Sequence, residues 1–338
     1  MSFMDKSAGV IPSPCAGEAS GLRKISTMRQ QSRGLPVREG GIVFLGKKPP
    51  AMHAFKLAGR NTVITRMHVP QAYSAYNVPD PEWITLHIPL SWDGSYVFDG
   101  REARAGEAFL TNNPNGYTTR GENRDALTLG PKRDALEAAM RSMFGHCADS
   151  FDFRASVHRP SPMLMRAIAT QIDAAIEAET SQEARQELHF MHEVAERDFL
   201  DVLALEFRTA LRTNSKYNGL RRHAVDVVAE ARQLTLAHSA SVPSLSEICA
   251  ATRVGQTRLF ECFQEVHGLA PYKCLMSFRL CAAHERLTDK DNPPHSVKQV
   301  AMDAGFTKAG RFAQCFFEQF GERPSEVLGR TRAERMLN

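Results

Sequence analysis

The residues with the clearest chemical pattern lie in two short segments near the C-terminus that carry guanidinium, amide and ammonium groups. A guanidinium group binds both acceptors of guanine, and a side-chain amide binds adenine. Arg258 and Arg311 therefore suit guanine and Gln314 suits adenine, with a phosphate contact or a solvated side chain as the alternative for each. The candidate base-reading residues are Gln256, Thr257, Arg258 and Phe260 in the first segment, and Lys308, Ala309, Arg311 and Gln314 in the second.

Four further basic residues are candidate contacts to a nucleic-acid backbone. A cation that neutralises a phosphate releases a condensed counterion, which favours binding. A solvated protein surface is an equally good interpretation of each residue. These candidates are Lys273, Arg279, Lys298 and Arg323.

The segment that positions these residues is repeated. Each copy predicts a short helix, a turn at 252–255 or 305–308, and a second helix with an apolar inner face. This is the spacing of a helix-turn-helix, whose first helix supports the second in a major groove, and a plain helical bundle is the alternative. The matching apolar and turn residues are Leu259, Phe263, Gly268 and Pro271 in the first copy, and Phe312, Phe316, Gly321 and Pro324 in the second.

The stretch 242–328 resembles the DNA-binding domain of AraC/XylS-family transcription regulators. The resemblance implies two helix-turn-helix units, at about 244–268 and 296–321, joined by a central helix at about 271–287 that sets the spacing of two major-groove contacts. The residues that carry it are Ser244–Cys249, Arg258–Phe263, Gly268–Tyr272, Arg279–Ala283, Val300–Phe306 and Phe312–Pro324.

Four positions depart from the family pattern. Family members usually have Ser at the start of each recognition helix and Arg two residues before the motif's Phe, whereas this chain has Gly255 and Glu261 in one copy, and Gly310 and Gln314 in the other. Glu261 cannot neutralise a phosphate. If it faces the groove it can accept from cytosine N4, and otherwise it is a solvated or ion-paired surface residue.

The first half of the chain predicts strands and then helices. Short β-type runs separated by turn signals at about 41–128 predict a sandwich or barrel. Helices are expected at about 161–179 and 182–212, and an apolar stripe on the second predicts a dimer seam, unless these helices cover the sheet or the next domain. The stripe consists of Leu188, Met191, Ala195, Phe199, Val202, Leu203 and Phe207.

This order is the one in which the family places a cupin-like sensor, a dimerisation element and the DNA-binding domain, and the run 106–114 resembles a cupin turn. The expected fold is therefore α+β, with a β-rich cupin-like sensor, a helical dimerisation element and an all-α C-terminal domain with two helix-turn-helix units. The expected parts are a loosely ordered tail at 1–38, the sensing and dimerisation domain at 39–212, a linker at 213–220 and the DNA-binding domain at 221–338.

An effector pocket in the β-rich part would be mostly apolar, with a few polar groups that orient the ligand. Core packing is the alternative for every aromatic residue there. If Arg66 or His87 points inward, an anionic or hydrogen-bonding metabolite is expected. The candidate effector-binding residues are Arg66, Tyr73, Tyr76, Trp83, His87, Phe98 and Tyr117.

A cupin-type enzyme is the alternative for this part, and an unregulated DNA-binding protein is the alternative for the whole chain. A metal cupin needs His and carboxylate ligands close together, whereas His53, His68 and His87 are isolated. His189 and His192 share a helical face without a third ligand. We therefore expect no catalytic residue, metal or cofactor.

The composition agrees with these expectations but does not by itself point to DNA binding. The net charge is only +4, the seven cysteines form no metal-binding spacing, and no long apolar run is present. The cysteines are expected to be reduced thiols in a cytoplasmic protein that contacts no membrane. The expected partners are double-stranded promoter DNA, a small-molecule effector and a second copy in a homodimer, with RNA polymerase as a further candidate; activation rather than repression is what the resemblance implies.

Overall fold

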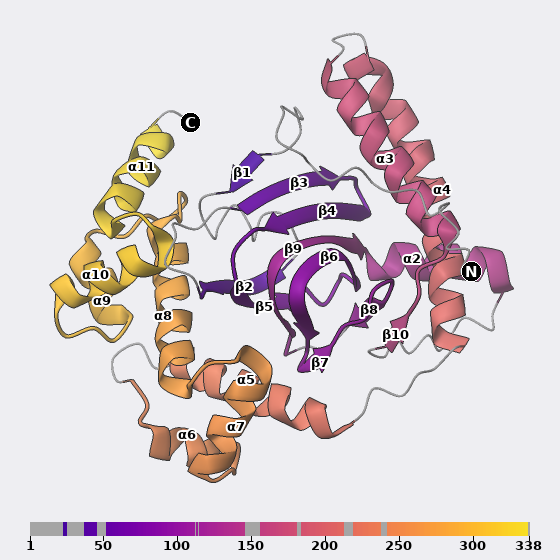
Figure 1. The fold of residues 1–338 in the computed structure, drawn as a ribbon. Helices are drawn as coiled ribbons and strands as arrows, with labels where there is room; N and C mark the ends of the chain where they lie inside the picture. The colour runs from indigo at the N-terminus through magenta and orange to yellow at the C-terminus, as the bar shows by residue number, and fades with distance from the viewer. Residues whose placement is uncertain are drawn as a thin grey trace.

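The chain folds into an N-terminal β-sheet with three covering helices and a C-terminal helical domain (Figure 1). The structure is a computed structural model. It describes residues 23–25, 37–45, 52–111, 113, 115–145, 156–180, 184–212, 219–237 and 242–336, with the side chains of all of these except 23–25, 176–194, 210–212 and 219–222.

Ten strands of the described residues form one sheet, in the order β1-β3-β4-β9-β6-β8-β10, while β5 joins β2 to β9 and β7 pairs with β6. The strands are β1 (Arg23–Ile25), β2 (Val37–Phe44), β3 (Met52–Ala58), β4 (Thr62–Val69), β5 (Tyr73–Pro79), β6 (Thr85–Phe98), β7 (Arg101–Glu102), β8 (Ala108–Thr111), β9 (Tyr117–Pro131) and β10 (Ser156–His158).

Strand β1 lies inside the expected N-terminal tail and pairs antiparallel with β3, Lys24 opposite His53. The rest of that tail before residue 37 lies outside the described residues. So do residues 213–218 of the expected linker, and helix α5 (Gly219–Ala237) begins directly after them.

The long strand β9 organises the sheet because it pairs with β4, β5 and β6. Its backbone is left-handed at Asn123, with a φ of 46°. There the register with β6 shifts. Glu122 and Asp125 of β9 are three residues apart, whereas their partners Asp93 and Ser91 of β6 are two residues apart. The extra residue is a β-bulge, which reverses the alternation of inward and outward side chains along the strand.

The two faces of the sheet bury different kinds of side chain. One face, here called the aromatic face, carries the stacked rings of His87, Tyr96, Phe98, Phe109 and Tyr117, and Tyr73 belongs to the same core. The other face is aliphatic, with Ile64, Leu86, Ile88, Leu127 and Leu129.

Three helices cover the aliphatic face, namely α2 (Arg133–Phe144), α3 (Pro162–Thr180) and α4 (Ala184–Arg212). Phe199, Leu203 and Phe207 of the predicted dimer stripe are all within this core. The side chains of Leu188 and Met191 lie outside the described residues. The described part of the stripe therefore covers the sheet of its own chain, which was the alternative expectation.

Buried carboxylates fasten α4 to the sheet. One oxygen of Glu196 accepts hydrogen bonds of 2.8 Å from the amides of Asn61 and Thr62 and from the Thr62 hydroxyl. Glu206 accepts from the Ser161 amide and lies 3.1 Å from Nε2 of His158. Burial alone would raise the pKa of Glu206, but the hydrogen bonds from His158 and Ser161 outweigh it and lower this pKa.

The C-terminal domain is entirely helical among the described residues. Its helices after α5 are α6 (Leu245–Thr252), α7 (Gln256–His267), α8 (Pro271–Leu287), α9 (Val297–Asp303), α10 (Ala309–Phe320) and α11 (Pro324–Met336). No helix among the described residues is long and apolar enough to cross a membrane.

The domain packs directly on the sheet. The ring of Tyr76 meets that of Phe278 edge-on, with 5.0 Å between centroids, and Arg232 lies 4.5 Å above the Tyr76 ring. The Ser74 hydroxyl lies 2.7 Å from Nδ1 of His267. Burial lowers the pKa of His267 to about 3, so the imidazole is neutral at neutral pH. Gly41 makes room, because a Cβ atom there would lie 2.3 Å from the Tyr76 ring.

We expect Leu203→Ala to lower the free energy of unfolding by about 2–5 kcal/mol, because it leaves a cavity in the core beneath α4. Leu205→Ala on the same helix is the matched control. Since Leu205 is 36% exposed, its loss should cost no more than about 0.5 kcal/mol. Urea denaturation followed by circular dichroism measures both, and equal losses would contradict this packing.

We expect Gly41→Ala to lower the free energy of unfolding by about 1–3 kcal/mol, because the added methyl group forces Tyr76 away from Phe278. Gly329→Ala on α11 meets nothing within 4 Å and should be neutral or stabilising by up to about 1 kcal/mol. Thermal unfolding of both variants checks this, and a stable Gly41→Ala protein would show that the sheet and the helical domain do not dock through Tyr76.

Candidate nucleic-acid interface

The first helix pair, α6 and α7, begins and ends at residues suited to those positions. Ser244 caps α6 in a capping box with Glu247, and Arg253, with a φ of 56°, ends it. Gly255 is the N-cap of α7 and supplies no side-chain hydrogen bond, which costs only a few tenths of a kcal/mol relative to Ser. Gly268 ends α7 in the left-handed conformation.

The second pair, α9 and α10, has the same plan. The Ser296 hydroxyl caps α9, and Gly321 ends α10 in the left-handed conformation. The turn between them needs Gly305, whose φ is 75° and whose added Cβ would lie 2.4 Å from Val242. Lys308 is the N-cap of α10.

Helix α8 positions both pairs. Its first half, with Cys274 and Phe278, shares a core with Leu259 and Phe263 of α7. Its second half, with Leu280 and Leu287, shares a core with α9, α10 and α11. The inward side chains of α10 form an aromatic column next to this helix, namely Phe312, Phe316 and Phe320, whose tilted rings contact each other, and His284 stacks on Phe316.

A polar cluster ties the end of α10 to α8 and α11. Glu322 lies 3.4 Å from Nε2 of His284 and 2.9 Å from Nη2 of Arg330. Burial alone would raise the pKa of Glu322, but the hydrogen bonds from His284 and Arg330 prevail and lower this pKa. The carboxylate therefore stays charged at neutral pH.

The predicted base-reading residues of α7 lie on its outer side. Gln256, Thr257 and Phe260 are exposed, and Phe260 lines a shallow groove of about 540 Å³. Arg258 is half-buried, and its Nη1 lies 3.1 Å from Oε2 of Glu261. Glu261 is thus ion-paired and exposed, and it competes with any acceptor for the Arg258 guanidinium.

The predicted residues of α10 are all exposed, namely Lys308, Ala309, Arg311 and Gln314. Gln314 donates a 3.0 Å hydrogen bond to Glu318 and lines a groove of about 410 Å³ together with Phe317 and Arg323. Arg311 has no ion pair within the part of the chain that the structure describes.

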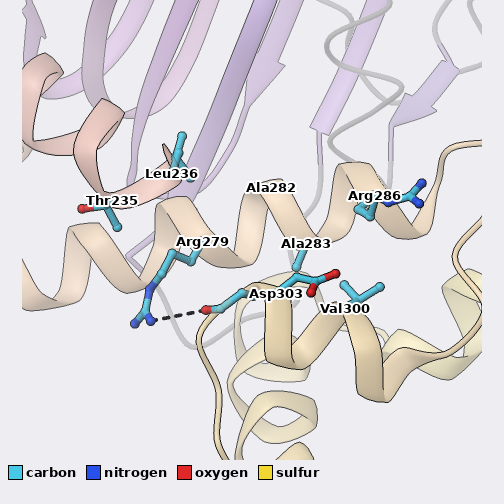
Figure 2. A pocket seen from close by; sticks show the side chains of 9 residues that line it. Thr235, Leu236, Arg279, Ala282, Ala283, Arg286, Val300 and Asp303 are labelled. Atoms are coloured by element: carbon cyan, nitrogen blue, oxygen red, sulfur yellow. Dashed lines mark hydrogen bonds between the residues drawn. The ribbon is translucent and has the colours of Figure 1, made fainter. Parts of the chain in front are cut away.

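The four predicted phosphate contacts differ in their surroundings. Lys273, Lys298 and Arg323 are exposed. Arg279 is half-buried beside a small cavity of about 100 Å³, where Figure 2 shows its guanidinium bonded to the turn before α10. Its Nη1 donates to the Ala304 carbonyl at 3.3 Å, and the group lies 5.4 Å above the Phe306 ring. Arg279 therefore holds the turn of the second helix pair in place, and its side chain is still partly exposed.

Sequence reasoning did not single out three exposed apolar residues of this domain, Tyr272, Met302 and Phe317, which are 61%, 55% and 52% exposed. Phe317 carried a usable signal. It follows Phe316 directly, and a helix of 3.6 residues per turn places it about 100° away from the line of Phe312, Phe316 and Phe320.

The structure brings only part of the predicted effector set together. Tyr73, His87, Phe98 and Tyr117 share the aromatic face. Arg66, on β4, does not belong to this face and is paired with Asp125 at 2.6 Å. Tyr76 packs against Phe278 in the C-terminal domain, and Trp83 lies beneath Lys132 at the start of α2.

His87 is held by two hydrogen-bonding contacts on the aromatic face. Its Nδ1 lies 3.0 Å from Oγ1 of Thr128 and its Nε2 lies 2.7 Å from the Tyr96 hydroxyl. Burial lowers the pKa of His87 well below its ordinary value, so the ring is neutral at neutral pH. Tyr96 and Arg124, which sequence reasoning did not select, also belong to this face. Arg124 follows the bulge at Asn123, which reading the strand by simple alternation does not reveal.

No group of three or more His, Cys, Asp or Glu side chains that could hold a metal ion occurs among the described residues. The rings of His53 and His68 stack at 6.2 Å without a nearby carboxylate ligand set. The side chains of His189 and His192 lie outside the described residues.

Comparison with known proteins identifies the C-terminal domain. Residues 248–330, from within α6 to within α11, match the family model described as a helix-turn-helix domain. The chain is 30% identical over 89 residues to XylDLEGF operon transcriptional activator 1 of Pseudomonas putida, covering 26% of this chain and 27% of that protein. It is 32% identical over 81 residues to the HTH-type transcriptional regulator ExsA of Pseudomonas aeruginosa, covering 24% of this chain and 28% of that protein.

One solved structure is similar in sequence to part of this chain. The probable AraC family transcriptional regulator from Rhodopseudomonas palustris is 30% identical, and the match covers 98% of that chain and 32% of this one with a TM-score of 0.29. The chain spans about a quarter of the length of the curated relatives that it matches. Residues 248–330 are therefore a helix-turn-helix domain of the type found in AraC/XylS-family transcription regulators.

Proposed function

We propose that this chain is a sequence-specific DNA-binding transcription regulator controlled by a small-molecule effector. The pairs α6–α7 and α9–α10 act as two helix-turn-helix units, and α7 and α10 enter successive major grooves. The observation that carries the proposal is the pair of like helices supported by α8, each with an exposed outer side that holds the predicted base-reading residues.

The curated relatives at the C-terminal domain include operon activators, which supports activation as the direction of control. The sheet domain is the proposed cupin-like sensor, because its aromatic face combines buried rings with polar groups, as effector pockets do. The close docking of this domain on α7 and α8 gives a ligand a route to change how the helix pairs are presented.

The proposed dimer uses the helices α3 and α4, although the described part of the apolar stripe is buried within the chain. Among the described side chains of these two helices, the exposed large apolar ones are Met163 and Leu205. Analytical ultracentrifugation of the full chain measures its oligomeric state. A monomer at micromolar concentration in the absence of DNA would contradict a dimer that forms without DNA.

The experiment that tests the function is binding of the full chain to DNA from upstream of its own coding sequence, with random DNA as competitor, at several salt concentrations and against a panel of metabolites. Specific binding that a metabolite changes supports the whole proposal. Specific binding without any metabolite response indicates an unregulated DNA-binding protein, and failure to prefer any DNA would contradict the regulator assignment.

We expect Arg311→Ala to weaken binding to the specific site by about 1–3 kcal/mol and to relax preference at one base pair, because it removes a bidentate donor. Random DNA should be bound almost as before. Arg104→Ala, an equal charge change on an exposed residue of the sheet domain, is the control and should change neither affinity. Equal losses on specific and random DNA would show that Arg311 contacts phosphate only.

We expect Glu261→Gln to strengthen binding to all DNA and to steepen its salt dependence. If Arg258 gains one phosphate contact, the slope of log affinity against log salt concentration should become more negative by up to about 0.9. The reason is that the variant releases the Arg258 guanidinium and removes a negative charge from α7. Fluorescence anisotropy over a salt series measures this. Weaker binding confined to the specific site would instead show that Glu261 reads a base, and Glu102→Gln in the sheet domain controls for net charge.

A further inference from the structure

Arg124 is a buried cation on the aromatic face of the sheet. It lies on β9 opposite Val69 of β4, directly after the bulge at Asn123, and is only 2% exposed. Its guanidinium group lies 5.1 Å from the centre of the Tyr73 ring and has Tyr96 as a hydrogen-bond partner.

Two of its donor atoms are unused. Nε and Nη2 of Arg124 have no hydrogen-bond partner among the described residues, and no described acidic side chain forms an ion pair with it. An arginine stays charged in proteins, and an unpaired charge out of contact with water costs several kcal/mol. A protein that retains such a group in its interior usually has a use for it.

A second buried arginine of the same sheet, on the neighbouring strand β4, shows which partner a buried guanidinium binds here. Arg66 uses its Nε and Nη2 atoms together to hold the Asp125 carboxylate, at 3.1 Å and 2.6 Å. The same two atoms are the unpartnered pair in Arg124. Side by side, they match the two oxygens of a carboxylate.

The neighbours of Arg124 supply no negative charge. Burial raises the pKa of Tyr73, Tyr96 and Tyr117, so these phenols are neutral at neutral pH. His87 is neutral as well. A ligand here would therefore have to bring the anion itself.

The remaining neighbours indicate the rest of the ligand. Phe98, Phe109 and Tyr117 stack with ring centroids 4.5–5.2 Å apart, so the surroundings of Arg124 on this face are largely apolar. The Tyr73 hydroxyl is buried beside the side chains of Thr119 and Tyr96 and makes no hydrogen bond of full geometry among the described residues, so it can donate to a second ligand oxygen. Together these groups suit a carboxylate whose body is small and apolar.

We propose that Arg124, with the Tyr73 hydroxyl beside it, is the anchor of a binding site for a small carboxylate on the aromatic face of the sheet. The inference rests on the proposed function in that this carboxylate is the effector. It narrows the ligand to a monoanion with an apolar body and places the charge recognition at Arg124 rather than at Arg66.

The test is thermal unfolding of the full chain with matched pairs of probes, namely acetate, butanoate and benzoate against acetamide, butanamide and benzamide. Each pair has nearly the same shape and differs in charge. The wild-type protein should be stabilised by at least one carboxylate and not by its amide. Arg124→Met should abolish this shift, and Tyr73→Phe should weaken the affinity by roughly tenfold, as loss of a hydrogen bond to a charged group does.

Stability without any probe provides a second measurement that does not depend on the choice of ligand. Arg124→Met removes an unpaired buried charge and should leave the melting temperature unchanged or higher. Arg66→Met is the matched control, and it should lower the melting temperature because Asp125 is left buried without its partner. A loss in Arg124→Met as large as that in Arg66→Met would show that Arg124 is structural and would overturn the proposal.

The proposal is also overturned if no carboxylate stabilises the wild-type protein more than its amide, or if Arg124→Met retains the shift. These outcomes are separate from failure of the proposed regulation. A carboxylate that binds through Arg124 but leaves DNA binding unchanged upholds the site and contradicts its role as an effector site. Specific DNA binding that responds to a metabolite equally in the wild type and in Arg124→Met upholds the regulator and contradicts the site.

Discussion

Burial of helix α8 is the interaction on which the rest of the structure depends. Its first half packs against α7, its second half against α9, α10 and α11, and the Cys281 thiol reaches the Ile42 carbonyl of β2 at 3.8 Å. One helix thus holds both helix pairs and the sheet. Because a packed core resists small displacements, a shift at any of the three contacts changes the position of the others. The spacing of α7 and α10 is therefore a property of the core.

The sheet contains two buried arginines whose charges are treated differently. Arg66 is neutralised by Asp125 and serves the fold, because the pair satisfies its own hydrogen bonds. Arg124 is surrounded by neutral phenols and by rings, with a free pair of donors. Burial removes both arginines from water. Asp125 compensates for that cost at Arg66, whereas Arg124 needs an anion from outside the chain. This contrast separates a structural cation from a binding cation more clearly than residue type does.

Much of the helical domain could be predicted, whereas the effector set could be predicted only in part. The Phe312 and Phe316 spacing and the turn glycine Gly305 are local signals, and both residues of the spacing are buried as expected. Arg66 and Trp83, in contrast, lie away from the aromatic face, and Arg124 lies on it. Strand alternation predicts which residues share a face only while the register is regular, and the bulge at Asn123 interrupts it.

By itself, the sequence determined where the two helix pairs begin and end and which of their residues face inward, because caps, turn conformations and helical periodicity act within a few residues. Only the tertiary structure decided what those elements pack against. It buried Phe199, Leu203 and Phe207 beneath the chain's own sheet, and it left Nε and Nη2 of Arg124 without a hydrogen-bond partner among the described residues. These outcomes depend on side chains far apart in sequence competing for the same buried space, and burial is what makes a free charge costly enough to require a ligand.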